Sequence, residues 1–143
     1  LRSPLTSTKD RTMTAFPPLT HVALTVSDLS VSVPWYERLI GAPPVLDEDT
    51  GPFHHVVFAV GPTLLGLHAF PSGIPAGDGF DERRLGLDHV AFACTDRSDL
   101  EKWQSHLDEL GIDHGGIVDA HYGSGLAFRD PDRIALEFFA PPA

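Results

Sequence analysis

Two stretches decide the fold: Thr20–Asp28 (THVALTVSD) and Asp88–Asp96 (DHVAFACTD) repeat one another at a distance of 68 residues. The same offset places Trp35 on Trp103, and a second match follows near the end of each copy. There LHAF at 67–70 aligns with LEFF at 136–139, at an offset of 69. Self-similarity over this length predicts two copies of one structural module.

Local patterns give each copy the order βαβββ. Bulky apolar and small residues alternate in both opening stretches, which is typical of a half-buried strand. Apolar residues at helical spacing follow at 29–40 and 98–110, and each run ends at a glycine suited to a left-handed cap. Three further strands are predicted in each copy, near 45–46, 53–60 and 63–70, and then near 116–119, 125–129 and 133–139. The fold class is therefore α+β, with two tandem modules whose mixed sheets enclose a cavity.

Chain length and composition set the domain plan and exclude some functions. The 143 residues suffice for one domain, and a formal net charge of −10 argues against nucleic acid as a partner. No apolar run is long enough to span a membrane, and the single cysteine favours a reducing, cytoplasmic setting. The predicted segments are a flexible tail at 1–18, in which Met13 is a candidate natural start, and one domain at 19–140, made of module one (19–70), a linker (71–87) and module two (88–140).

Four residues at related places in the repeat are candidate metal ligands. His21 and His89 lie near the start of the first strands, whereas His68 and Glu137 lie in the last strands. Glu137 is flanked by apolar residues, and a carboxylate is costly to bury there unless it is paired or bound to metal. Histidine with carboxylate is a donor set for Zn²⁺, Ni²⁺, Co²⁺, Mn²⁺ or Fe²⁺, so we expect a divalent ion as cofactor.

The other histidines lack this placement. His54 and His55 are neighbours, so at most one of them faces the cavity if both are in a strand. His106 is expected on the solvated side of the second helix, and His114 and His121 in loops. Tyr122 with the glycine-rich 123–125 is interpreted as a turn, with a mobile flap as the alternative.

The chain resembles the vicinal oxygen chelate superfamily, also called the glyoxalase/bleomycin resistance/dioxygenase superfamily. The likeness covers about residues 19–140 and rests on three motifs. These are HVAL at 21–24, the helix end WYERLIG at 35–41, and FRDPDRIALE at 128–137, in which Arg133 replaces the glycine usual in the family. The resemblance implies metal ligands on the first and last strands of each module, where His21, His68, His89 and Glu137 lie. Glutamate is usual at the His68 position in the glyoxalase I-like members.

Three hypotheses for function follow. The leading one is a metal-dependent glyoxalase-like lyase or isomerase, which binds two neighbouring oxygens of a small substrate and uses Glu137 as general base. The second is an extradiol-dioxygenase-like Fe²⁺ enzyme, against which a fourth protein ligand would count. The third is a non-catalytic drug-binding protein of the bleomycin-resistance kind. Because relatives often build the site across two chains, the resemblance also implies a homodimer.

Overall fold

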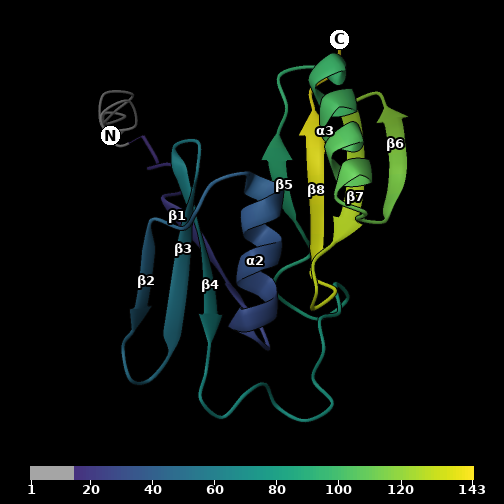
Figure 1. Ribbon diagram of the computed structural model, residues 1–143. Coiled ribbons are helices and arrows are strands. Elements are labelled where there is room, and N and C mark those ends of the chain that lie inside the picture. The colour runs from purple at the N-terminus through teal and green to yellow at the C-terminus, as the bar shows by residue number, and fades with distance from the viewer. Residues whose placement is uncertain (1–14) are drawn as a thin grey trace, which may run out of the picture.

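The computed structural model describes residues 15–143, so Met13 and most of the expected tail lie outside the described residues. Both modules fold in the predicted order (Figure 1). Module one contains β1 (His21–Thr25), α2 (Leu29–Ile40), β2 (Leu46–Asp49), β3 (His54–Val60) and β4 (Thr63–Ala69). Module two contains β5 (Val90–Ala93), α3 (Arg97–Glu109), β6 (His114–Ala120), β7 (Gly123–Arg129) and β8 (Ala135–Ala140).

Each module forms a four-stranded mixed sheet, with the strand orders β1-β4-β3-β2 and β5-β8-β7-β6. The first and last strands of a module pair in parallel, and the remaining pairs are antiparallel. The parallel pair is possible because the helix and two strands intervene in the chain and return it to the same edge. The predicted α+β class with two tandem βαβββ modules is thus confirmed.

The helix boundaries follow the expected capping chemistry. Asp28 accepts a hydrogen bond from the backbone N–H of Ser30 at the start of α2, and Asp96 accepts one from Asp99 at the start of α3. Gly41 ends α2 in the left-handed conformation, with φ 79°, which a glycine adopts without strain.

Three local predictions in module two are wrong. His106 is not fully solvated but half-buried: its Nε2 lies 3.0 Å from the carbonyl oxygen of Leu39, which joins α3 to the end of α2. His114 is the first residue of β6 rather than a loop residue, and its ring contacts Asp108 at 2.7 Å. The turn stops earlier than expected, because Gly123 already begins β7.

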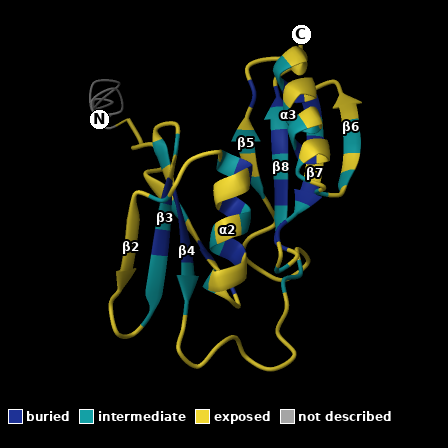
Figure 2. Cartoon of the chain, in the orientation of Figure 1, coloured by how far each residue is buried: buried dark blue, intermediate teal, exposed yellow. Residues whose placement is uncertain are grey.

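The two modules meet through α2 and one shared core. Trp35 of α2 lies 6.3 Å from Phe128 of β7, between ring centroids. The Tyr36 hydroxyl donates to the carboxylate of Asp130 at 2.7 Å, and both residues are buried. Figure 1 shows α2 between the two sheets, and Figure 2 shows buried residues gathered in the central strands while β2 is exposed throughout. The helix-facing sides of both sheets therefore form the core.

The opposite face of each sheet, here called its ligand face, remains largely open. In β1, Leu24 is buried towards the core whereas His21, Ala23 and Thr25 are exposed on the ligand face. In β8, Leu136 and Phe138 are buried, and the alternate residues are only half-buried. This alternation confirms the faces predicted for both strands.

Candidate metal centre

Module two places His89 and Glu137 on its ligand face. Glu137 pairs with Ala91 in the parallel ladder, so His89 lies two residues before it, level with Ala135. The Glu137 carboxylate lies over Gly125 of β7, where an added Cβ would stand 3.3 Å from Oε2. The ring of His89 contacts the carboxylate of Asp88 at 2.7 Å through Nδ1, which leaves Nε2 for another partner.

The ladder of module one corrects the equivalence drawn from sequence. Ala23 in β1 pairs with Gly66, just as Ala91 in β5 pairs with Glu137. The structural counterpart of Glu137 is thus Gly66, and His68 lies two residues further along β4 on the same face. The offset in the last strands is 71 residues and not 69, because the short LHAF and LEFF match does not follow the strand pairing.

The side chain of His68 nevertheless lies over Gly66. An added Cβ at Gly66 would lie 3.6 Å from Nε2 of His68 and 3.6 Å from the Cβ of Ala23. Phe53 stacks on the imidazole, with ring centroids 4.7 Å apart and planes at 14°. The imidazole therefore reaches towards the space that a side chain at 66 would occupy.

His55 joins the ligand face of module one, as the sequence allowed for one of the two adjacent histidines. It pairs directly with His68 between β3 and β4, and the ring centroids are 5.4 Å apart. Its Nε2 is buried and forms no hydrogen bond with the part of the chain that the structure describes. His54 points to the other side and contacts Asp47 at 2.5 Å.

The surroundings of His68 favour the neutral form of its imidazole. Partial burial lowers the pKa of His68, and the nearby His55 and His21 lower it further. A neutral imidazole is the form that binds a metal ion or accepts a proton.

The four candidate ligands divide two and two between the sheets. His21 and His68 belong to the ligand face of module one, and His89 and Glu137 to that of module two. Within residues 15–143 no three His, Cys, Asp or Glu side chains lie close enough together to hold a metal ion. One chain thus presents two half-sites.

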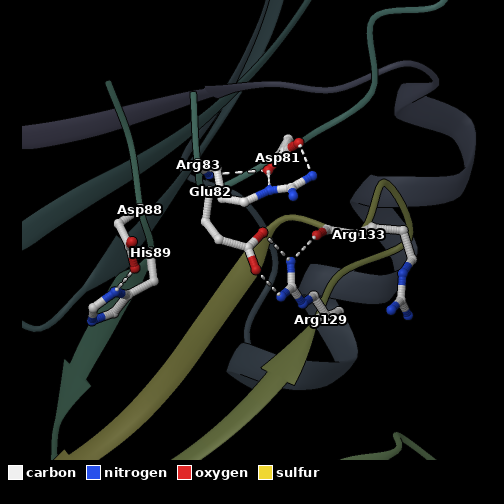
Figure 3. A network of polar contacts seen from close by, with 7 residues as sticks. All are labelled: Asp81, Glu82, Arg83, Asp88, His89, Arg129 and Arg133. Carbon is white, nitrogen blue, oxygen red and sulfur yellow. Dashed lines mark hydrogen bonds and ion pairs between the residues drawn. The ribbon is translucent and has the colours of Figure 1, made fainter. Parts of the chain in front are cut away.

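The half-site of module two opens into a cleft of about 880 Å³. Besides His89 and Glu137 it is lined by Glu82 of the linker, and by Asp88 and Arg129 of module two. Arg129 holds Glu82 through two hydrogen bonds, of 2.9 and 3.2 Å, and donates a third to the carbonyl oxygen of Arg133 (Figure 3). The guanidinium of Arg129 lowers the pKa of Glu82 to about 2. Sequence reasoning missed this pair, although Arg129 lies within the FRDPDR motif.

A family model described as the Glyoxalase/Bleomycin resistance protein/Dioxygenase superfamily matches residues 19–138. The chain belongs to this superfamily. Its duplicated βαβββ architecture agrees with that assignment, and members of the superfamily commonly use divalent metal ions.

Solved structures from the superfamily share the fold. A glyoxylase/bleomycin resistance protein/dioxygenase domain from Frankia sp. EAN1pec is 29% identical, with a TM-score of 0.77 over 89% of this chain and 93% of that chain. Lactoylglutathione lyase from Agrobacterium tumefaciens is 21% identical, with a TM-score of 0.66 over 86% of this chain and 92% of that one. At that identity the likeness shows the fold alone.

A curated relative matches over a shorter stretch. The protein named "Putative ring-cleaving dioxygenase MhqA" from Bacillus subtilis (strain 168) is 37% identical over 49 residues, which is 34% of this chain. The matched stretch spans only 16% of the length of that relative.

Among the described residues no helix is long and apolar enough to cross a membrane.

The residues present fit a divalent metal ion by their chemistry. His21 and His89 hold equivalent positions in the two modules, and Glu137 holds the position that Gly66 has in module one. Together these three residues supply two imidazoles and a carboxylate. Glu137 is half-buried, and a metal ion would balance the charge of its carboxylate.

Proposed function

We propose that the chain is a metal-dependent oxygenase of this superfamily, with His21, His89 and Glu137 as ligands and a small substrate that carries two neighbouring oxygens. The observation that supports it is the register of the strands. In module one, the position equivalent to Glu137 is Gly66, which has no side chain to bind a metal ion. Two histidines and one carboxylate with open positions form the set typical of non-haem Fe²⁺ oxygenases. With glycine at this position, the residue equivalent to Glu137 adds no fourth protein ligand that would crowd the metal.

Each residue has a task in this proposal. Bound Fe²⁺ would supply adjacent open positions for the two substrate oxygens and for dioxygen. Glu137 provides the negative charge that balances the ion, and Asp88 orients the ring of His89. His68 lies beside the site with a neutral ring, and it is suited to accept a proton from a substrate hydroxyl group.

The site would be completed by a second copy of the chain. The ligand faces point away from the shared core, and they carry exposed apolar side chains that a partner chain would cover. Among these are Leu46 and Leu64 in module one, and Val118 in module two. In a homodimer, module one of one protomer and module two of its partner would face each other across one cavity, and the two-fold axis would produce two identical sites.

A glyoxalase-like lyase or isomerase is the second candidate, because His68 leans over Gly66. If Nε2 of His68 binds the metal ion, the set becomes three histidines and Glu137. Zn²⁺, Ni²⁺, Co²⁺ or Mn²⁺ would then polarise a carbonyl group, and Glu137 would act as general base.

The role of His68 separates the two candidates. Protein loaded with Fe²⁺ under anaerobic conditions is expected to consume oxygen with catechol, and a His68→Ala variant is expected to keep its iron. Hemithioacetal isomerisation with Zn²⁺, Ni²⁺ or Co²⁺, lost in His68→Ala, would instead support the lyase. His54→Ala is the matched control, because His54 points away from the ligand face. Protein that purifies without metal and takes up none would favour a binding function.

Mixing two inactive variants tests the shared site. His21→Ala removes a ligand from one half-site, and Glu137→Ala removes one from the other. After the mixed chains exchange, a symmetric dimer is expected to regain roughly a quarter of the wild-type sites, because each mixed dimer has one intact site. No recovery with proven exchange of chains would mean that the site forms within one chain.

A further inference from the structure

We propose that Arg129 is a recognition site for a carboxylate of the substrate, and that Glu82 of the linker occupies it in the free protein. This inference rests on the proposed function, since it places the subsite beside His89 and Glu137. It narrows the substrate class to molecules that carry a carboxylate in addition to two neighbouring oxygens.

The sheet puts Arg129 on the ligand face, close to both candidate ligands. Arg129 pairs with Ala135 in the antiparallel ladder of β7 and β8, and Ala127 pairs with Glu137. His89 is level with Ala135 on the other side of β8. Arg129 and His89 therefore flank the small side chain of Ala135, with Glu137 one step along the same face. A molecule lying over Ala135 would reach both groups.

The geometry around Arg129 is already that of carboxylate binding. Nη1 and Nη2 each donate to one oxygen of Glu82, at 3.2 and 2.9 Å (Figure 3). This two-point contact is the arrangement that guanidinium forms with planar carboxylates in recognition sites. The ring of Phe80 in the linker lies below the guanidinium, with its centroid 5.9 Å from Cζ of Arg129.

Glu82 comes from the linker, and its contact with Arg129 is open to solvent, where a competing carboxylate can approach. The side chains of Arg129 and Glu82 are 33% and 40% exposed. Exposed ion pairs contribute little net stability, so a competing carboxylate can take the place of Glu82. The linker would then act as an internal substitute for the ligand.

Positive charge at the cleft would help this acidic chain to bind an anionic substrate. Its formal net charge is −10, which disfavours an anionic substrate unless arginine residues meet it at the site. Arg129 and Arg133 both line the cleft that contains His89 and Glu137. In Figure 3 the guanidinium of Arg133 points away from the Arg129–Glu82 pair. Arg129 is therefore the arginine that would bind the carboxylate of the substrate.

The test uses the metal-free full chain, with benzoate as the charged probe and benzyl alcohol as the neutral one. Binding is followed by titration in NMR spectra. Wild-type protein is expected to prefer benzoate, and Glu82→Gln is expected to bind it about fivefold more tightly because the competing carboxylate is gone. Arg129→Gln should weaken benzoate binding by about tenfold or more. Arg83→Gln is the matched control, because Arg83 is an exposed linker arginine paired with Asp81.

Two results would overturn the proposal. One is equal binding of benzoate and benzyl alcohol, and the other is a Glu82→Gln variant that binds benzoate no more tightly than wild type. Because Glu82→Gln is expected to gain affinity, loss of folding in Arg129→Gln would not obscure the answer. The titration needs no metal ion, so a chain that binds benzoate through Arg129 but shows no iron or oxygen chemistry would refute the proposed function alone.

Discussion

The two modules share one strand order, but their ligand faces carry different chemistry. Module one presents imidazoles: His21, His55 and His68 share its ligand face, and the His68 ring lies over Gly66. Module two presents charge: Glu137 lies near Arg129, which holds Glu82 of the linker. The same backbone thus supports one face rich in imidazole and another that carries an ion pair beside a carboxylate.

This difference indicates a division of labour between the two copies. At the position where module two has Glu137, module one has Gly66, so the proposed site would contain one carboxylate. A divalent ion with one carboxylate keeps a net positive charge, which favours binding of an ionised substrate oxygen. In the proposed function, this asymmetry between the modules would be the source of the reactivity.

The largest expected effect concerns the ligands themselves. His89→Ala or Glu137→Ala should lower metal affinity by more than about 100-fold, beyond the 10- to 100-fold typical of residues that only orient ligands. His68→Ala should cost less than about 100-fold, because His68 does not hold the position equivalent to Glu137. Isothermal titration with Fe²⁺ under anaerobic conditions measures both. Equal losses for His68 and Glu137 would restore the four-ligand set.

The contact that joins the two modules gives the next effect. Tyr36→Phe removes the donor to Asp130 and leaves a buried carboxylate oxygen without its partner. We expect the free energy of unfolding to fall by about 2 kcal/mol. Urea denaturation measures it, and Tyr122→Phe, at a residue that is 65% exposed, is the control. A loss as small as in the control would mean that the hydroxyl group is not needed to join the modules.

The sequence predicted the architecture because duplication and alternation are local signals. The faces of β1 and β8 came out as expected, since Val22 to Val26 and Leu136 to Phe138 alternate without interruption. The register of β4 could not be predicted in the same way. The pair Leu67-His68 resembles Leu136-Glu137 in sequence. Only the pairing of β1 with β4, however, shows which residue lies opposite Ala23, and that residue is Gly66. The contact of Arg129 with Glu82 joins residues 47 positions apart, so no local pattern indicates it.

A smaller effect on the free energy of unfolding is expected at the turns that join the last two strands of each module. Module one has Gly61 in the left-handed region, with φ 56°, whereas module two has Arg133 there, with φ 66°. A side chain in this conformation costs about 1–2 kcal/mol, and the greater freedom of glycine in the unfolded chain offsets part of the gain. Arg133→Gly should therefore raise the free energy of unfolding by about 0.5–1 kcal/mol. A destabilised variant would show that the arginine side chain contributes more than its backbone conformation costs.

The smallest effect is a titration in the half-site of module two. Because the guanidinium of Arg129 holds the pKa of Glu82 at about 2, below the ordinary 4.5, the carboxylate stays ionised when the solution is acidified from neutral to about pH 3. A lowered pKa means that the contact stabilises the fold above pH 4.5 and that this contribution is lost as the pH falls towards 2. Carbon NMR of the Glu82 carboxyl group follows the titration directly. In Arg129→Gln the midpoint should rise towards the ordinary value, and a wild-type midpoint already near it would mean that Glu82 does not occupy Arg129 in solution.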